Sequence, residues 1–386
     1  MSSHGEFGRT VRAELQKRGL SIRAASKAMN YNHAFLSRVL AGKQDPSPEL
    51  VDSLDALLDA GGALVKRANR EHVATNPTLL NGACGDDYAH TIRETSRKLI
   101  ELDNDLNGLP IADAAARAFK TVHRRLGECD YNSSHERDIR AAAAELAEIT
   151  GWALFNAGKF DASRRFNQEA LFLAKLSGDR STERLTLQNM GMLAGWVGRH
   201  REELAIARSV LEQGPLAPRV EAIFRAREAQ GLAGSASDGE VTRSFDRARS
   251  LLQESAPGDS PNWAWWISGK EIDRQQGRVL HETGQWRAAI PVLQRAMEPE
   301  SGAHVGYRTI ASVRLLACLL EMHAWKDAEE EAGKIIPAVS EMSSVVTLNL
   351  LAEICRRGEE LTGAPFSLRD ALRRISVSMN EDPYAI

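Results

Sequence analysis

Apolar residues recur at intervals of three and four along most of the chain, which places them on one face of an α-helix. Few segments alternate apolar and polar positions as a β-strand does. At residues 69–86 the helical pattern gives way to NREHVATNPTLLNGACGD, a stretch rich in Asn, Gly, Thr and Pro that predicts a linker. The chain is therefore predicted to be all-α, with a small bundle at residues 1–68 and an α-solenoid of helix pairs at residues 87–386.

The first unit opens with two short helices. Phe7, Val11 and Leu15 lie four residues apart, so they share one face of the first helix. Gly19 can end that helix in a left-handed conformation. Ser21 then caps a second helix over residues 22–29.

A tight turn and a third helix follow. Asn30 suits this turn, because the turn needs a positive φ and Asn is the best non-glycine residue for it. Asn32 can cap this third helix. Two short helices joined by a three- or four-residue turn form a helix-turn-helix. The residues expected to face inward from the third helix are Phe35, Leu36, Val39 and Leu40.

The first unit closes with two more helices. Ser47, Pro48 and Glu49 provide an N-cap, a proline at the first helical position and an acid in the first turn. Gly61 and Gly62 end this fourth helix, and residues 63–68 predict a short fifth one. The apolar face of the fourth helix is Leu50, Leu54, Leu57 and Leu58.

The stretch 19–50 resembles the Cro/repressor-like (XRE-type) helix-turn-helix of bacterial transcriptional regulators, and the resemblance covers about residues 6–66. The matching elements are Leu20-Ser21, Leu36-Ser37-Arg38-Val39, Gly42 and Pro46-Ser47-Pro48-Glu49-Leu50. The chain departs from the family pattern at Ile22, where a phosphate-contacting Gln is frequent, at Asn30 in place of Gly, and at Leu40 in place of Glu. The Ile22 departure puts that phosphate contact in doubt, whereas Asn30 is conformationally compatible with the turn.

The resemblance implies that the third helix lies in the major groove of DNA with its N-terminal residues over base edges. An Asn can bond adenine and an Arg can bond guanine. Asn32 has two open roles, base contact or helix cap, and Arg38 is either a base or phosphate contact or a solvated arginine. The residues that the resemblance assigns to DNA binding are Ser21, Arg23, Lys27, Asn32, His33, Ala34, Ser37, Arg38 and Lys43.

Charge is divided unevenly along the chain. The net charge is −3, which taken alone argues against a protein that coats nucleic acid. Residues 1–45, however, hold eight basic and three acidic side chains, a net +5, so the other 341 residues carry −8. A basic DNA-binding unit is thus joined to an acidic remainder.

Residues 87–386 contain a weak repeat. A small or apolar residue is followed seven positions later by a turn, and an aromatic residue or His comes soon after, as in Gly277, Gly284 and Trp286. This pattern resembles the tetratricopeptide repeat, with spacing near 40 residues instead of 34. The other matching units start at Gly151, Gly191 and Leu316, whereas a unit at residues 223–252 matches the pattern poorly. Residues 117–126 are expected to belong to an earlier helix pair. Residues 345–361 and 366–376 are expected to form capping helices at the end of the array.

In such solenoids the first helix of each pair lines a concave binding face. The resemblance carries a mixed polar and aromatic lining onto this chain, suited to a peptide or small polar ligand. It also suggests a peptide-pheromone receptor in which Asn189 binds the peptide backbone. The alternative is that Trp152 and Phe155 only pack and the polar residues are solvated. The candidate lining is Glu145, Glu148, Trp152, Phe155, Gln188, Asn189, Met192, Arg274, Arg278 and His281.

Three tryptophans, Trp263, Trp265 and Trp266, fall within four residues and cannot share one helix face. Either one of them is exposed at a partner surface, or the segment is buried all round. Their role is left open by the sequence.

Catalytic and metal-binding motifs are absent from the sequence: no phosphate loop, nucleophile elbow, zinc-binding His pair or EF-hand occurs. The four cysteines have no Cys-x-x-Cys spacing, which favours buried residues in a reducing cytoplasm. No apolar run is long enough for a membrane span, and no signal peptide is visible. We expect a cytoplasmic protein that is no enzyme, needs no cofactor and does not bind a membrane.

These features predict a transcriptional regulator that binds a double-stranded DNA operator as a homodimer. Its helical array would dimerise and sense a peptide, a small-molecule effector or a protein partner. The competing hypothesis is an interaction scaffold whose helix-turn-helix no longer reads DNA, because Ile22 and Leu40 make that surface more apolar than usual.

Overall fold

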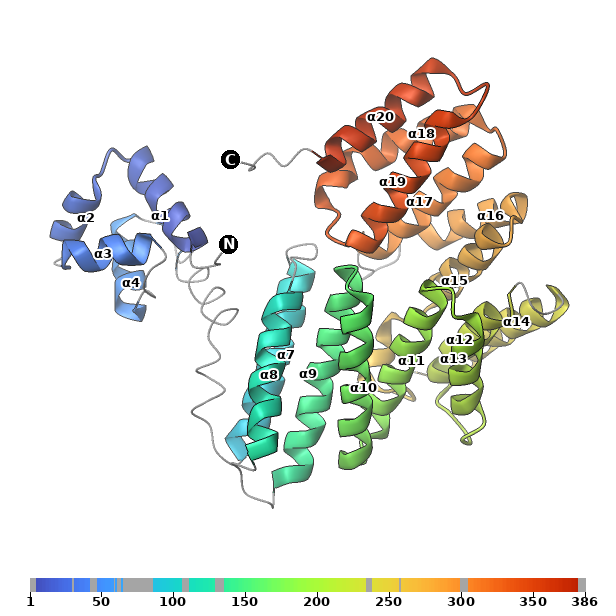
Figure 1. The fold of residues 1–386 in the computed structure, drawn as a ribbon, viewed down its shortest axis with the longest axis horizontal. Helices are drawn as coiled ribbons and strands as arrows, with labels where there is room; N and C mark the ends of the chain where they lie inside the picture. Colours follow the sequence, from blue (N-terminus) through green and yellow to red (C-terminus); the bar gives the residue numbers. More distant parts are fainter. Residues whose placement is uncertain are drawn as a thin grey trace.

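The computed structural model describes residues 5–29, 31–41, 47–58, 60, 64, 86–105, 111–128, 135–233, 238–256, 258–298 and 305–380. Helices account for the regular structure throughout these residues, and no strand occurs among them (Figure 1). The all-α prediction is confirmed. The predicted linker at 69–86 lies outside the described residues, except for Asp86, which begins a helix.

The N-terminal unit is a bundle of short helices, coloured blue in Figure 1. Gly8 lets the first helix approach the third closely, because a Cβ at this position would overlap the main-chain carbonyl of Leu40. The core contains Val11, Leu36 and Leu54 as expected, Phe35 and Leu57 pack against it half-buried, and the side chain of Phe7 lies outside the described part of the chain. The helices are α1 (Gly5–Lys17), α2 (Ile22–Ala28), α3 (His33–Leu40) and α4 (Pro48–Leu57).

The predicted helix ends of this unit are confirmed where the structure describes them. Gly19 has φ +66°, in the left-handed region. Ser21 Oγ accepts a hydrogen bond from the Ala24 amide at 3.1 Å, and Ser47 Oγ accepts one from the Leu50 amide at 3.3 Å. Asn30 and most of the predicted fifth helix lie outside the described residues.

The array is a series of antiparallel helices that pack mainly on their neighbours in sequence (Figure 1). Its helices are α7 (Asp86–Asp105), α8 (Ala112–Glu128), α9 (Glu136–Asn156), α10 (Phe160–Ser177), α11 (Arg180–Trp196), α12 (His200–Leu211), α13 (Pro218–Leu232), α14 (Asp238–Glu254), α15 (Gly269–Glu282), α16 (Trp286–Met297), α17 (Val305–Glu321), α18 (Trp325–Ile335), α19 (Val345–Glu360) and α20 (Phe366–Asn380). Two 3₁₀ segments, η2 (Asn262–Trp266) and η3 (Ile336–Glu341), interrupt the series.

Four helix pairs share one turn geometry, which establishes the repeat on the backbone. Gly158, Gly198, Gly284 and His323 sit in the turn between paired helices with φ of 71°, 77°, 72° and 54°. In each case the next residue donates its amide to a carbonyl five positions back, as Gln285 does to Leu280 at 2.8 Å. The weak sequence repeat therefore corresponds to a structural repeat, and its fourth copy uses a histidine where the others use glycine.

The pair α13–α14 is a helix pair like its neighbours, although its sequence matches the repeat poorly. It is followed by the short segment η2, where the three tryptophans lie. Trp263 and Trp266 pack against the core beside α13, whereas Trp265 is 54% exposed. The segment is thus not buried all round, and a partner surface at Trp265 stays a prediction.

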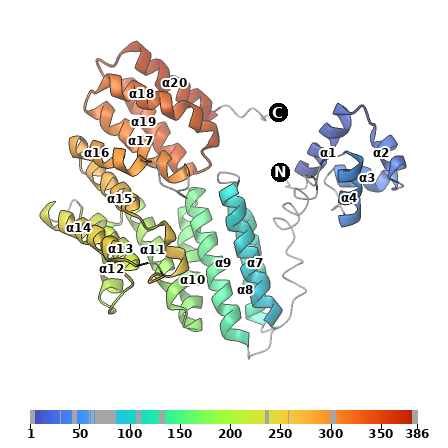
Figure 2. The same ribbon diagram turned by 180° about the vertical axis from the view of Figure 1, so that it is seen from behind.

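The array closes on itself, because its C-terminal part returns to its first repeat. Val346 at the start of α19 packs with Phe155 of α9 and Leu193 of α11 in one buried cluster. Val345 lies close to Gly158, where a Cβ would be 3.4 Å from its Cγ1. Seen from behind, the orange and red C-terminal helices cover the ends of the green helices (Figure 2). The inner side of the curved array is therefore filled by the C-terminal helices where α19 meets α9 and α11.

Candidate nucleic-acid interface and the inner face of the array

Helix α3 divides its residues between the core and the surface. Leu36, Val39 and Leu40 are buried in the N-terminal core. Since these positions fix which side faces inward, the opposite side is presented outward, with His33 exposed and Ser37 and Arg38 placed away from the core cluster. This is the orientation that a recognition helix needs, with polar side chains that can donate and accept hydrogen bonds directed away from the bundle.

Asn32 acts as a helix cap. Its Oδ1 accepts a hydrogen bond from the Phe35 amide at 3.3 Å, while the residue itself is exposed. The capping role is therefore the one seen in the structure, and the base contact stays a prediction.

The exposed cations of α2 lie on the same unit. Arg23 and Lys27 are exposed, and so is Ser21, whose hydroxyl caps α2. These positions leave the two cations available for phosphates, as the resemblance implies. Lys43 lies outside the described residues, and the side chain of Ala34 is likewise not described.

The apolar surface that suggested a scaffold is not present at Leu40. This side chain is 2% exposed and belongs to the core. Ile22 is half-buried and packs against the same core. The inference from Leu40 was wrong, because its spacing from Leu36 directs it inward with the other core residues.

Comparison with known families agrees with this geometry. A family model described as a helix-turn-helix domain matches residues 6–68. The N-terminal unit is a helix-turn-helix, and the chain is at this coarse level a DNA-binding regulator. No curated protein matches the chain. The tetratricopeptide resemblance of the array stays a prediction.

The residues predicted to line a concave binding face turn out to be largely buried. They lie on α9, α11 and α15, the first helices of their pairs, as expected. Glu145, Trp152, Met192, Arg274 and His281 are partly exposed, and Glu148, Phe155, Gln188, Asn189 and Arg278 are buried. The inner face is therefore built mostly from contacts between repeats.

Glu148 and Asn189 form one such contact. The Asn189 side-chain amide donates to Glu148 Oε1 at 2.5 Å, and both residues are buried. Burial raises the pKa of Glu148 to about 7, because the charged carboxylate loses its water, and the Asn189 hydrogen bond opposes this only partly. As a peptide contact, Asn189 stays a prediction that requires this pair to open.

A second polar network joins the next repeats. The buried Arg227 guanidinium donates to Gln230 at 2.7 Å and to Gln188 at 3.4 Å. The fully buried carboxylate of Glu203 lies 3.7 Å from Arg227 and accepts no hydrogen bond within the described residues. Burial raises the pKa of Glu203 to about 7 and lowers that of Arg227 to about 10. Arg227 lies in the repeat that the sequence pattern matched poorly.

The aromatic part of the predicted lining is packed. Trp152 and Phe155 stack with their centroids 6.0 Å apart, and Phe155 also contacts Trp196 edge-on at 5.8 Å. Val346 of α19 completes this cluster. The packing interpretation of Trp152 and Phe155 fits these contacts, because α19 covers them.

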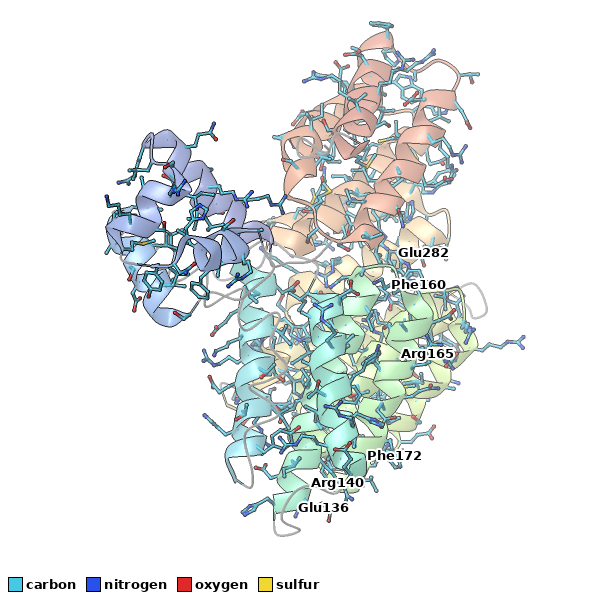
Figure 3. The ribbon with its side chains drawn as sticks, turned by 60° about the vertical axis from the view of Figure 1, so that its left-hand side comes forward. Glu136, Arg140, Phe160, Arg165, Phe172 and Glu282 are labelled. Atoms are coloured by element: carbon cyan, nitrogen blue, oxygen red, sulfur yellow. The ribbon has the colours of Figure 1, made fainter. Side chains whose placement is uncertain are left out.

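A cluster of arginines lies next to this aromatic group. Arg278 and Arg314 both approach the Trp196 ring, at 5.2 and 5.5 Å from its centroid. Glu282, at the end of α15, is their carboxylate partner. Figure 3 labels Glu282 and Phe160 near the level where the orange and red C-terminal helices meet the green helices. Trp196 and Arg314 were not predicted as site residues, although an arginine within the apolar run of residues 311–320 was a usable signal.

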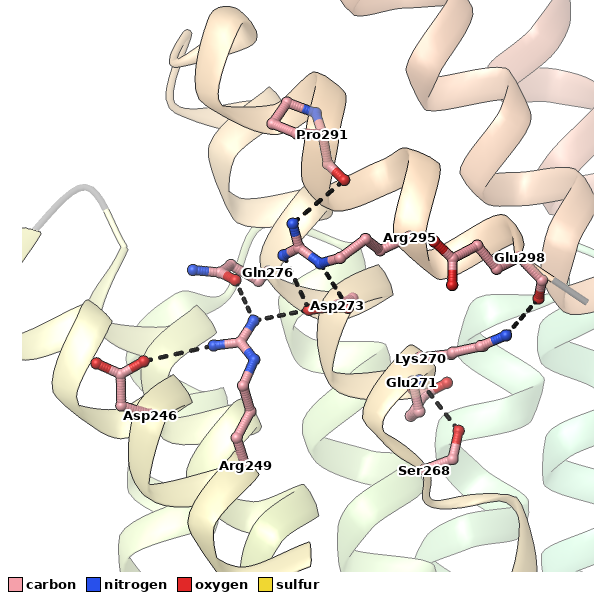
Figure 4. Close-up of polar contacts among 10 residues, drawn as sticks. All are labelled: Asp246, Arg249, Ser268, Lys270, Glu271, Asp273, Gln276, Pro291, Arg295 and Glu298. Atoms are coloured by element: carbon pink, nitrogen blue, oxygen red, sulfur yellow. Dashed lines mark hydrogen bonds and ion pairs between the residues drawn. The ribbon is translucent and has the colours of Figure 1, made fainter. Parts of the chain in front are cut away.

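A separate surface pocket of about 450 Å³ lies between α14, α15 and α16. Arg249 and Arg295 converge there on Asp273, with Arg249 Nη2 2.8 Å and Arg295 Nε 3.3 Å from its carboxylate (Figure 4). Arg249 also pairs with Asp246. Both guanidiniums are therefore engaged with carboxylates of the chain.

The described residues contain no group of three or more His, Cys, Asp or Glu side chains arranged to hold a metal ion. Burial raises the pKa of Cys318 and Cys355 to about 12, so both remain thiols. Among the described helices, none is both long and apolar enough to cross a membrane.

Proposed function

We propose that this chain is a sequence-specific transcriptional regulator that binds its operator as a homodimer through α2 and α3. The observation that carries the proposal is the outward face of α3, with His33 exposed and Arg38 directed away from a core sealed by Leu36. A single module of this size makes few base contacts, so two half-sites would be needed for specificity.

The array is proposed to be the dimerising and sensing part, responding to a peptide, a small ligand or a protein partner. Its inner face holds buried polar networks and arginines that do not pair one to one with carboxylates. A ligand that replaces one of these internal contacts would favour a second arrangement of the inner face. Allosteric control requires two such arrangements that differ in their affinity for the ligand. The proposal is of a binding protein and not of an enzyme.

The test is Arg38→Ala in DNA binding. Genomic fragments captured by the wild-type protein are sequenced, and an enriched fragment is used in fluorescence anisotropy against a scrambled sequence. Removing one bidentate base contact should weaken specific binding by ~1–3 kcal/mol and reduce discrimination against the scrambled sequence.

Arg356→Ala is the control. Arg356 is exposed on α19 and pairs with Glu353 and Glu360 within its own helix, so its loss should leave DNA binding unchanged. If Arg38→Ala binds the fragment as the wild type does, α3 is not the reading helix. If the wild type enriches no fragment, the scaffold hypothesis gains support. Sedimentation velocity on the same preparations tests the homodimer.

A further inference from the structure

Two buried arginines on the inner face of the array share one carboxylate. The side chains of Arg278 on α15 and Arg314 on α17 are only 6% and 4% exposed. Arg278 Nε donates to Glu282 Oε1 at 2.7 Å, and Arg314 Nη2 lies 4.0 Å from the same oxygen. Two positive charges are thus set against one negative charge in a region with little water.

The hydrogen bonds of the two arginines are unequal. Arg278 Nη2 also donates to the Gly195 carbonyl at 2.9 Å. Arg314 donates no hydrogen bond to the described part of the chain; Glu282 is its ion-pair partner, and its guanidinium lies 5.5 Å from the centroid of the Trp196 ring. A guanidinium has five N–H donors. Arg314 is therefore a largely buried cation that keeps donors for a ligand.

The surrounding charges do not neutralise this excess. Arg274 lies nearby but is paired with Glu271, and Arg357 is paired with Glu321 at 2.6 Å. Burial lowers the pKa of Arg314 to about 9, and the charge of the neighbouring Arg278 lowers it in the same direction. His281 faces the cluster as well, and burial followed by the charge of Arg314 lowers its pKa to about 4, so it is neutral at pH 7.

The Glu203 carboxylate is the remaining acidic group facing Arg278. It lies behind Gly195, where a Cβ would overlap its Oε2, and is completely buried. Because its pKa is raised to about 7, it supplies at most part of a negative charge near neutral pH. Glu282 is different, since its side chain is 40% exposed and can turn out to solvent.

We propose that Arg278 and Arg314, packed on Trp196, form an oxyanion-binding site on the inner face, and that Glu282 occupies it when no ligand is bound. The ligand would bring a carboxylate or phosphate group that accepts from both guanidiniums as Glu282 swings away. Arginine suits this role, because its planar fork matches both anions bidentately. The site deepens the sensing role proposed above and rests on it.

The experiment is thermal unfolding of the full chain in inorganic phosphate, compared with chloride at the same ionic strength. Phosphate should raise Tm, because an anion that binds only the folded chain stabilises it. Glu282→Gln removes the internal competitor while keeping the shape, so the same rise in Tm should be reached at about fivefold lower phosphate. Arg314→Gln should abolish the phosphate-dependent rise. Acetate in place of phosphate distinguishes a carboxylate site from one that prefers phosphate.

The control is Arg295→Gln in the surface pocket, where a second arginine pair lies against Asp273. This variant should keep the phosphate response. If the response survives Arg314→Gln, or is lost only in Arg295→Gln, the proposed site is wrong. If Arg314→Gln does not fold, Glu282→Gln decides, and an unchanged dependence of its Tm on phosphate concentration overturns the proposal. DNA binding measured on the same preparations reports the α3 assignment separately.

Discussion

Asn189 on α11 donates its side-chain amide to the buried carboxylate of Glu148 on α9, one repeat earlier in the array. The pair joins two consecutive inner helices through a polar contact at a place where apolar packing would also serve. A buried carboxylate held by a neutral amide is only partly compensated for its lost hydration. The inner face therefore contains groups whose energies depend on protonation.

The contribution of Glu148 to the free energy of unfolding should fall as the pH rises from 5 to 7.5. The folded-state pKa of Glu148 is raised to about 7 by burial, above its usual value, so the folded chain binds more protons than the unfolded chain in this range. Stability is then fully present below pH ~4.5 and is lost as the pH rises through ~7, by ~1–3 kcal/mol for one such carboxyl. Glu203 acts in the same direction.

Glu148→Gln isolates this contribution. The amide mimics the protonated acid and can still accept from Asn189, so the variant should match the wild type at pH 5 and exceed its stability by ~1–3 kcal/mol at pH 7.5. Urea unfolding at both pH values measures the difference. His281, whose lowered pKa works in the opposite direction at acid pH, is present in both proteins and cancels. A pH-independent difference would refute the assignment.

Two glycines at the same repeat position should respond oppositely to alanine. A Cβ at Gly277 would overlap the buried Leu293 side chain of α16, whereas a Cβ at Gly191 would lie 3.8 Å from Ile206. Gly277→Ala should destabilise the chain by ~1–3 kcal/mol through overpacking. Gly191→Ala should be neutral or stabilise by up to ~1 kcal/mol, since alanine favours helix. Thermal unfolding of both variants checks this, and equal losses would contradict the role of close crossing.

We expect the turn glycines to be needed because they adopt a left-handed backbone conformation, and not because a side chain would clash with neighbouring atoms. Gly198 has φ +77°, and a Cβ added to it would have no neighbouring atom within 4 Å, so Gly198→Ala meets only backbone strain. We expect a loss of ~1–2 kcal/mol. Gly333→Ala, equally uncrowded but within α18, should instead gain up to ~1 kcal/mol. Circular dichroism melts compare them, and a neutral Gly198→Ala would show that the left-handed turn is dispensable.

The salt dependence of DNA binding should distinguish residues that contact phosphates from residues that contact bases. Lys27 is an exposed cation on α2, so Lys27→Ala should weaken binding to all sequences and reduce the slope of log K against log salt by about 1. Arg38→Ala should mainly reduce discrimination between sequences. Anisotropy titrations at several salt concentrations measure both, and an unchanged slope in Lys27→Ala would remove it from the phosphate-binding set.

The sequence predicted the structure best at positions where the local backbone conformation requires a particular type of residue. Ser21 and Ser47 cap helices, Gly19 ends one, and Gly158 and Gly284 form turns, all as predicted. These features depend on neighbouring residues only, so a pattern in a single sequence can reveal them. The core face of α3 was also predictable, because its spacing follows the helical period.

Contacts between distant parts of the chain were not predictable in this way. Carrying repeat positions over placed Asn189 and Glu148 on the inner face, but their mutual hydrogen bond depends on the offset between α9 and α11. The covering of Phe155 by Val346 depends on the accumulated curvature of all the intervening helices. The contact of Arg314 with Trp196 depends on the same curvature, which brings α17 towards α11.

The return of α19 onto α9 changes how the array should lose its structure. In an open solenoid each repeat contacts only its neighbours, so end repeats can fray independently. Here Val346 joins the last helices to Phe155 and Leu193 of the first repeats. We therefore expect the helices from α9 to α20 to support one another and to unfold in one melting transition. A signal that loosens the seam at α19 would thus be felt by every repeat at once.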